Sequence, residues 1–215
     1  MDRFVLYIGN RNYSSWSLRP WMAFEGCGIP FEEVLLPFDF ENGNPHLREV
    51  SPTGRVPVLH HGDMRVWESL AIIEYAAELF PEAGLWPAAR HAKAIARSVS
   101  MEMLSGFVAL RSACPMNIRR PKRAIALPAG VAANVARIET IWRECRATSG
   151  GPFLFGAFSA ADAMFAPVVS RFDTYDLVRS ADTLDYMNTI KAHPAFVKWR
   201  DLACAEPWIV RQDEV

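Results

Sequence analysis

The sequence lacks the features that would assign it to a membrane, secreted or strongly charged class of protein. None of its 215 residues lies in an apolar run long enough to span a bilayer. The start, Met1-Asp2-Arg3-Phe4, has neither the charged n-region nor the apolar stretch of a signal peptide, so we expect a cytosolic protein. The 23 basic and 24 acidic residues leave a formal net charge of −1. This balance gives no global field that would attract nucleic acid or an anionic membrane.

Cysteine is scarce as well, and the spacing of the four that are present excludes common metal and redox motifs. Cys27, Cys114, Cys145 and Cys204 include no Cys-x-x-Cys pair and have no histidine at zinc-ligand spacing. We therefore expect no metal, and we interpret the cysteines as reduced, mostly buried thiols. No glycine-rich phosphate loop is present. What remains is an ordinary folded composition, with 51% hydrophobic and 22% charged residues.

The first 80 residues alternate between strand-like and helix-like patterns, whereas almost everything after residue 89 has a helical pattern. Strands are expected at Phe4–Ile8, Glu32–Leu36, Val56–Leu59 and Met64–Trp67. Helices are expected from about Ser17, which we take as a helix cap, to Gly26 and from Glu68 to Phe80. Two prolines and a glycine interrupt residues 81–88. The sequence therefore predicts an α/β unit at 1–80, a linker at 81–88 and an all-helical unit at 89–215.

Two amphipathic stripes predict long helices in the second unit. Their steps of three and four residues place each stripe on one helix face. The stripes are Ile95, Val99, Met103, Phe107 and Leu110, and Val135, Ile138, Trp142 and Cys145. The last helices are expected at residues 181–192 and 195–206.

Ser159 and Asp162 have the spacing of a capping box. In this motif the serine oxygen accepts from the first helical turn while the carboxylate reaches back to the cap. We assign both residues to folding and expect the loss of the cap to cost about 1 kcal/mol. Pro167 follows eight residues after the cap and would kink or break this helix.

Four motifs, in their order and spacing, resemble those of the cytosolic glutathione transferases across the whole chain. They are Tyr13-Ser14-Ser15-Trp16-Ser17-Leu18-Arg19, Ser51-Pro52-Thr53-Gly54-Arg55-Val56-Pro57-Val58-Leu59, Glu68-Ser69-Leu70-Ala71-Ile72 and Ser159-Ala160-Ala161-Asp162. The Ser-Ser-x-Ser-x-Arg pattern is most similar to the serine-type branch, in particular the zeta class that includes maleylacetoacetate isomerases. Trp16 stands where that class usually has cysteine, a position that borders the thiol.

The resemblance implies an α/β plus all-α fold, in which a thioredoxin-like domain of order βαβαββα precedes an all-helical domain. It also implies glutathione as cosubstrate and a homodimer. The thiol would add to a small hydrophobic or carboxylate-bearing electrophile. Conjugation, a glutathione-dependent cis–trans isomerisation and peroxide reduction all stay open.

Glutathione chemistry requires a thiolate near neutral pH, whereas a free thiol with a pKa near 8.5 is mostly protonated there. A serine hydroxyl at a helix N-terminus donates a hydrogen bond to the sulfur, and the helix dipole adds positive potential. By the resemblance, Ser14 matches the first serine of the zeta-like motif and Ser15 matches a theta-like spacing. We favour Ser14 as the catalytic residue and keep Ser15 as the second candidate. By local sequence alone, both are ordinary turn and N-cap residues.

The resemblance implies two segments that bind glutathione. In the family fold the Val56–Pro57 bond is cis, which frees the backbone of Val56 to pair with the cysteinyl part of glutathione. Without the resemblance, Pro57 would simply begin an edge strand. Glu68 and Ser69 offer an acceptor and a donor at a helix start, where free amides attract a carboxylate. The alternative for this pair is a simple N-cap.

Two basic residues are candidates for binding the carboxylate at the glycyl end of glutathione. Arg55 resembles the basic residue that has this role in the family, and His46 is a weaker candidate. Most isolated arginine and histidine residues of this kind are surface groups.

The electrophile would lie over the thiol, between the small domain and the first long helix. The candidates are Trp16, Met103, Phe107 and Arg111. A methionine and aromatic stripe at helical spacing is more often core than substrate pocket. Arg111 would either bind a substrate carboxylate or pair with the terminal carbonyls of its own helix.

Two other classes of function compete with an enzyme. The same fold serves as a non-catalytic interaction scaffold, although Ser14, Glu68 and Ser69 argue against it. The basic run Arg119-Arg120-Pro121-Lys122-Arg123 would suit nucleic acid, but no aromatic residue interleaves it. We interpret this run as a solvated loop and expect neither nucleic acid nor a membrane as partner.

Overall fold

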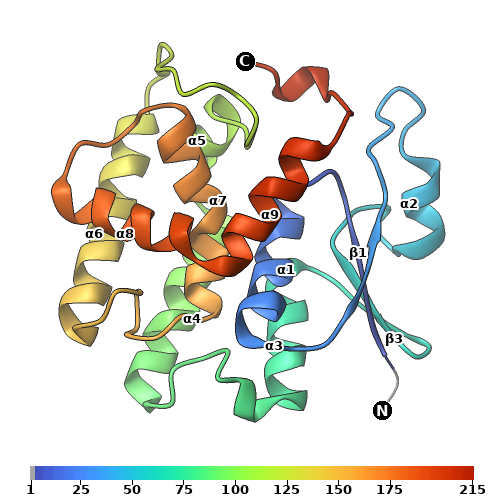
Figure 1. The fold of residues 1–215 in the computed structure, drawn as a ribbon, viewed down its shortest axis with the longest axis horizontal. Coiled ribbons are helices and arrows are strands. Elements are labelled where there is room, and N and C mark those ends of the chain that lie inside the picture. The colour runs from blue at the N-terminus through green and yellow to red at the C-terminus, as the bar shows by residue number, and fades with distance from the viewer. Residues whose placement is uncertain (1–2) are drawn as a thin grey trace.

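The structure, a computed structural model, describes residues 3–215 and divides into a small sheet with its helices and a larger group of helices (Figure 1). The first part holds β1 (Phe4–Ile8), α1 (Ser15–Cys27), β2 (Glu32–Leu35), α2 (Pro45–Val50), β3 (Val58–His61), β4 (Met64–Val66) and α3 (Ser69–Leu79). The second part holds α4 (Arg90–Ser105), α5 (Val108–Ala113), α6 (Val131–Ser149), α7 (Ala160–Thr174), α8 (Ala181–Ala192) and α9 (Pro194–Ala205). Short 3-10 helices lie at Pro81–Ala83 and Arg211–Asp213.

The four strands form one mixed sheet in the order β2-β1-β3-β4. Strand β1 is parallel to β2 and antiparallel to β3, and β4 is antiparallel to β3. Phe4, Leu6 and Ile8 alternate along β1 and are all buried, as the two-residue period of a strand requires. The order βαβαββα, including the short α2, confirms the predicted thioredoxin-like arrangement.

Helix α1 joins the two parts of the molecule. It packs against α3 within the first part and against α7 and α9 of the second, and Figure 1 shows it between the sheet and the later helices. Leu18, Trp21 and Phe24 have exposed fractions of 0%, 1% and 0%. A helix that is buried on nearly every face is a core element, so the start of α1 is held in place by both parts.

Helix α7 runs without interruption from Ala160 to Thr174, although Pro167 lies inside it. Of the two predicted effects of this proline, a kink or a break, the break is therefore wrong. Proline removes one helical hydrogen bond, but almost every residue of α7 is buried against its neighbours. This tertiary packing outweighs the local preference.

The first amphipathic stripe belongs to two helices and not to one. Helix α4 ends at Ser105, and α5 begins at Val108. Between them Phe107 has a left-handed φ of 57°, which is uncommon for a bulky residue. Val99, Met103, Phe107 and Leu110 are nevertheless all buried. Ile95, the first residue of the predicted stripe, is 38% exposed, so the apolar face begins one step later than predicted.

The predicted capping box is present at the start of α7. The Asp162 carboxylate accepts hydrogen bonds from the Ser159 N–H at 2.9 Å and the Leu154 N–H at 3.0 Å. It also accepts from the hydroxyls of Ser159 at 2.9 Å and Tyr186 at 3.0 Å. Complete burial raises the pKa of Asp162 to about 6, although these hydrogen bonds oppose the shift.

The cysteines are free thiols, with Cys114 and Cys145 buried, Cys27 half-buried and Cys204 exposed. Burial raises the pKa of the Cys114 thiol to about 11, so this group is an unreactive thiol near neutral pH. Among residues 3–215 there is no group of three or more potential metal ligands. Within the same range, no helix is both long and apolar enough to cross a bilayer.

Candidate functional site

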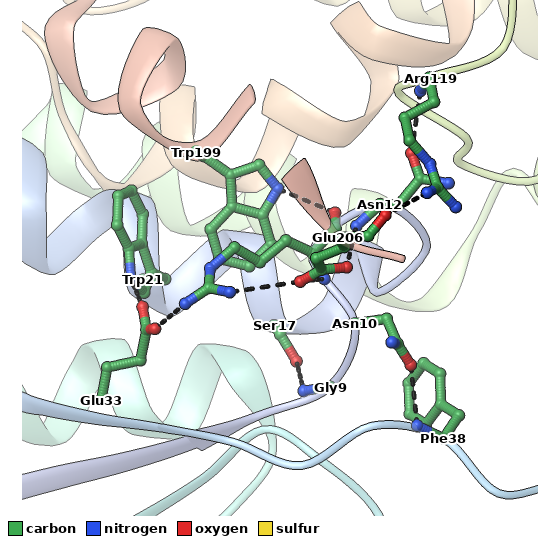
Figure 2. Close-up of polar contacts among 11 residues, drawn as sticks. Gly9, Asn10, Asn12, Ser17, Trp21, Glu33, Phe38, Arg119, Trp199 and Glu206 are labelled. Atoms are coloured by element: carbon green, nitrogen blue, oxygen red, sulfur yellow. Dashed lines mark hydrogen bonds and ion pairs between the residues drawn. The ribbon is translucent and has the colours of Figure 1, made fainter. Parts of the chain in front are cut away.

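Ser14 is the N-cap of α1, and its hydroxyl is engaged by the protein. Its Oγ accepts from the Ser17 N–H at 3.3 Å and donates to Ser17 Oγ at 2.7 Å. Ser17 Oγ also accepts from the Gly9 N–H at 3.1 Å, which ties α1 to the end of β1 (Figure 2). Ser17 therefore lies inside the helix, and Ser14 is the cap in its place.

Ser15, the first residue of α1, lines a cavity of about 290 Å³ between the two parts of the molecule. The other lining residues are Trp16, Val108, Arg111, Ser112 and Arg171. They come from α1, α5 and α7. Because Ser15 is at the N-terminus of a 13-residue helix, the cavity lies at the positive end of that helix dipole.

The predicted electrophile residues divide between this cavity and the core. Trp16 and Arg111 line the cavity. Met103 and Phe107, with exposed fractions of 0% and 7%, belong to the hydrophobic core. These two residues therefore match the alternative interpretation, in which the stripe belongs to the core.

Two guanidinium groups lie over the Trp16 ring. The guanidinium carbon of Arg19 is 4.3 Å from the ring centroid, and that of Arg111 is 4.7 Å from it. Arg19 is only 1% exposed, and its Nε and Nη1 have no hydrogen-bond partner among the described residues. Burial, followed by the charges of Arg171 and Arg111, holds the pKa of Arg19 well below its ordinary value, while Glu68 opposes the shift.

The start of α3 carries an unpaired hydroxyl. Ser69 is its first residue and is 0% exposed, and its Oγ has no hydrogen-bond partner within residues 3–215. Glu68 occupies the N-cap position without a side-chain capping bond and is exposed. Free first-turn amides and an unpaired hydroxyl form a binding place for a carboxylate. Because α3 packs against α1, this place and the Ser15 cavity lie on neighbouring helices.

The segment before β3 has the backbone form that the resemblance implies. The Val56–Pro57 peptide bond is cis, and the Trp67–Glu68 bond is cis as well. Arg55 has an exposed side chain, and its backbone N–H donates to Ser51 Oγ at 3.3 Å. His46 is held by its own region instead, with Nε2 2.8 Å from the carbonyl oxygen of Pro37.

A buried polar cluster before α1 was not predicted from the sequence. The Glu206 carboxylate, at the end of α9, accepts from the backbone N–H groups of Arg11 at 2.9 Å and Asn12 at 3.3 Å. The Asn12 side chain donates to Asn117 at 2.9 Å. Figure 2 shows Asn12, Glu206 and Arg119 meeting beside the loop that leads into α1. No sequence pattern indicates the Glu206 contacts, because nearly two hundred residues separate the partners.

Part of the basic run belongs to the same cluster, which corrects its interpretation as a solvated loop. Arg119 donates to the Tyr13 hydroxyl at 3.1 Å and to the carbonyl oxygens of Glu206 and Trp208. Arg120 donates to the carbonyl oxygen of Val215 at 2.7 Å. Through these hydrogen bonds, Arg119 and Arg120 hold residues near the C-terminus close to Tyr13, which directly precedes α1.

Arg19 and Arg171 are two further site residues that sequence reasoning did not single out. Each is a buried charge in a helix made mostly of apolar residues. That is a detectable signal, since charged residues are almost never fully buried without a reason. Their association with Arg111 became visible only in three dimensions.

Known proteins with similar sequences cover both parts of the chain. The family models "Glutathione S-transferase, N-terminal domain" and "Glutathione S-transferase, C-terminal domain" match residues 13–79 and 124–202. "Glutathione S-transferase 1" of Dianthus caryophyllus is 36% identical over 86 residues, which are 40% of this chain and 38% of that protein. A "Probable maleylacetoacetate isomerase" of Caenorhabditis elegans is 31% identical over 120 residues, or 56% and 55% of the two chains. The matches thus span about half of these relatives or less.

Solved structures share the fold over nearly the whole length. A glutathione transferase homologue from Burkholderia, solved with bound glutathione, has a TM-score of 0.71 at 22% identity and covers 94% of this chain and 98% of its own. The omega 3C glutathione transferase of Trametes versicolor has a TM-score of 0.70 at 20% identity, with 93% and 84% coverage. The sheet, the helices and the two matched domains agree, and the chain belongs to the glutathione S-transferase family.

Proposed function

We propose that this protein is a glutathione transferase that binds glutathione, holds its thiol as thiolate and adds it to a small electrophile. The sheet domain, residues 1–80, would bind glutathione, and the helical domain, residues 89–215, would complete the electrophile site. Family membership supports the reaction class. The observation that carries the proposal is a pair of helix starts, on helices that pack against each other, one with Ser15 on a cavity and the other with the unpaired hydroxyl of Ser69.

Ser15 is the group that we propose to activate the thiol. Both Ser14 and Ser15 match serine positions of the family, but the hydroxyl of Ser14 is used in the cap of α1. Ser15 would donate to the sulfur, and the N-terminal dipole of α1 together with Arg111 and Arg171 would add positive potential. The thiol proton would leave to solvent. The sulfur lone pair would then form the carbon–sulfur bond as a leaving group departs with its bonding electrons.

Ser69 and Glu68 would bind the γ-glutamyl end of glutathione. The unpaired Ser69 hydroxyl and the free amides of α3 suit its carboxylate, and the Glu68 carboxylate suits its ammonium group. The backbone of Val56, beside the cis bond to Pro57, would pair with the cysteinyl part, and Arg55 with the glycyl carboxylate. His46 is the weaker choice for that carboxylate, because its ring already contacts Pro37.

Glutathione binding tests this assignment by titration calorimetry. We expect wild-type protein to bind with a dissociation constant between about 1 μM and 1 mM. A variant with Glu68→Ala and Ser69→Ala should bind at least about tenfold more weakly, because a charge-assisted hydrogen bond contributes roughly 1.5–3 kcal/mol. The matched control, Glu78→Ala with Ser98→Ala, changes the same residue types at exposed positions and should bind like wild type.

Absence of glutathione binding by the folded wild-type protein would overturn the proposed function and favour the interaction scaffold. Equal weakening in the control variant would contradict the assignment of Glu68 and Ser69. Maleylacetoacetate isomerases are among the relatives, but Trp16 beside the thiol position leads us to retain the transferase as the main proposal. A homodimer in the cytoplasm is the arrangement that family membership supports.

A further inference from the structure

The cavity beside Ser15 carries positive charge that no side-chain carboxylate among residues 3–215 neutralises directly. Arg111 Nη1 donates to the carbonyl oxygens of Leu104 at 3.1 Å and Gly106 at 3.3 Å. Arg171 Nε donates to the carbonyl oxygen of Cys114 at 2.8 Å. A carbonyl oxygen positions a guanidinium but leaves its net charge in place. Both charged groups line the cavity.

Arg19 is a further cation, in contact with the cavity residue Trp16. Its guanidinium and that of Arg111 both lie over the Trp16 ring, with each guanidinium carbon less than 5 Å from the ring centroid. Two of its nitrogens lack a hydrogen-bond partner among the described residues. Burial of a guanidinium without such partners is energetically unfavourable. The side chain is therefore arranged for a partner that residues 3–215 do not supply.

Burial, together with neighbouring positive charge in the case of Arg171, lowers the pKa values of the two arginines that line the cavity. Burial lowers the pKa of Arg111. Burial, and then the charge of Arg111, lowers the pKa of Arg171 to about 10. The acidic groups that face the region are Glu68, which acts on Arg19, and Asp213, which acts on Arg171. Within residues 3–215 neither acid forms an ion pair with these arginines, so a bound anion would relieve their mutual repulsion.

The volume and the lining residues of the cavity limit which kind of ligand can carry this anion. About 290 Å³ is at the lower end of the range for small-molecule sites. The Trp16 ring is already contacted by two guanidinium groups. A purely apolar electrophile would have to desolvate Arg111 and Arg171 without compensation, which is unfavourable.

We propose that the cavity is an anion subsite in which Arg111 and Arg171 bind a carboxylate of the electrophile beside the thiol. The inference rests on the proposed function, and it narrows the electrophile from small hydrophobic or carboxylate-bearing compounds to the carboxylate-bearing class. Arg19, whose guanidinium also lies over the Trp16 ring, is a positioning residue of this subsite. The planar guanidinium matches a carboxylate in geometry as well as in charge.

A matched pair of chloronitroarenes tests the subsite. We would compare neutral 1-chloro-2,4-dinitrobenzene with anionic 4-chloro-3,5-dinitrobenzoate at saturating glutathione. In Arg111→Met, which keeps an unbranched side chain but removes the guanidinium, the ratio of kcat/KM for the anionic over the neutral substrate should fall about 10- to 100-fold. Arg171→Lys, which keeps the charge, should lower this ratio less than Arg111→Met does. The matched control, Arg143→Met, removes an exposed arginine that pairs with Asp182 and should leave the ratio unchanged.

A binding measurement separates this inference from the function on which it rests. Unreactive 3,5-dinitrobenzoate should bind wild-type protein without glutathione, and Arg111→Met should weaken this binding about tenfold or more. An unchanged substrate ratio and unchanged benzoate binding in folded Arg111→Met would overturn the anion subsite. Benzoate binding that persists in a protein unable to bind glutathione would support the subsite while overturning the transferase. A loss of anion binding in Arg143→Met would show a nonspecific charge effect and contradict the subsite.

Discussion

Replacement of Ser15 by alanine should lower kcat/KM for a glutathione-dependent substrate by about 10²- to 10³-fold, the effect of removing one preorganised donor to a developing anion. The physical reason is that the hydroxyl lines the cavity at the positive end of α1 and would stabilise the thiolate over the thiol. Glutathione binding should change little, because Glu68 and Ser69 are proposed to bind the other end of the molecule. Steady-state kinetics and calorimetry together measure both quantities.

Two neighbouring serines provide matched controls for this prediction. Ser112→Ala removes a hydroxyl from the same cavity and should retain most of the activity. Ser14→Ala removes the cap of α1 and should reduce the free energy of unfolding by about 1 kcal/mol with a smaller effect on turnover. Full activity in Ser15→Ala, with activity lost in Ser14→Ala, would return the catalytic role to Ser14.

Replacement of Asp162 by alanine should reduce the free energy of unfolding by about 3–5 kcal/mol. The carboxylate accepts from Leu154, Ser159 and Tyr186 in the interior. Its removal leaves these donors buried without a partner, which is more costly than the loss of an exposed cap. Denaturant unfolding followed by circular dichroism measures the change.

The loss in Asp162→Ala should also depend on pH. The pKa of Asp162 is raised from an ordinary 3.8 to about 6, so the folded state favours the protonated form. This contribution to stability is fully present below about pH 4 and is lost as the pH rises through about 6. The difference between wild type and Asp162→Ala should therefore be larger at about pH 5 than at about pH 8. Asp182→Ala, an exposed residue in a surface ion pair, should change stability by less than about 0.5 kcal/mol, and an equal loss there would contradict the account.

Sequence patterns predicted those parts of the fold that depend on interactions between residues close together in the chain. Strand β1 and helix α8 have the bounds expected from their patterns. Apolar residues that alternate every second position indicate a strand, and apolar residues at helical spacing indicate a helix. The capping box formed for the same reason, since Ser159 and Asp162 are three residues apart. These features depend on neighbours along the chain.

The features that long-range packing determines were not predictable in this way. The helix at Pro167 continues because surrounding helices bury it. The turn at Phe107 leaves the apolar spacing of its stripe intact, so the period gives no sign of it. The choice between Ser14 and Ser15 depends on which hydroxyl the cap uses, a detail that two adjacent serines in a sequence do not reveal.

The contacts of the charged residues in the site were likewise not predictable from local sequence patterns. Arg111 was a candidate from its position, and the structure places it on a cavity with Arg171, sixty residues further along the chain. The contacts between Glu206 and the loop before α1 join parts of the chain that are far apart in the sequence. An arginine within a mostly apolar helix is an unusual pattern, but only the fold shows which charges meet.

The pKa of the thiol in bound glutathione is the most direct test of the central claim that this site holds a thiolate. Ultraviolet absorbance of the thiolate, titrated against pH in the protein–glutathione complex, gives this value. The account predicts a pKa at least about one unit below the ordinary 8.5 of a free thiol, with most of the shift lost in Ser15→Ala. Bound glutathione with an unshifted thiol pKa would contradict it.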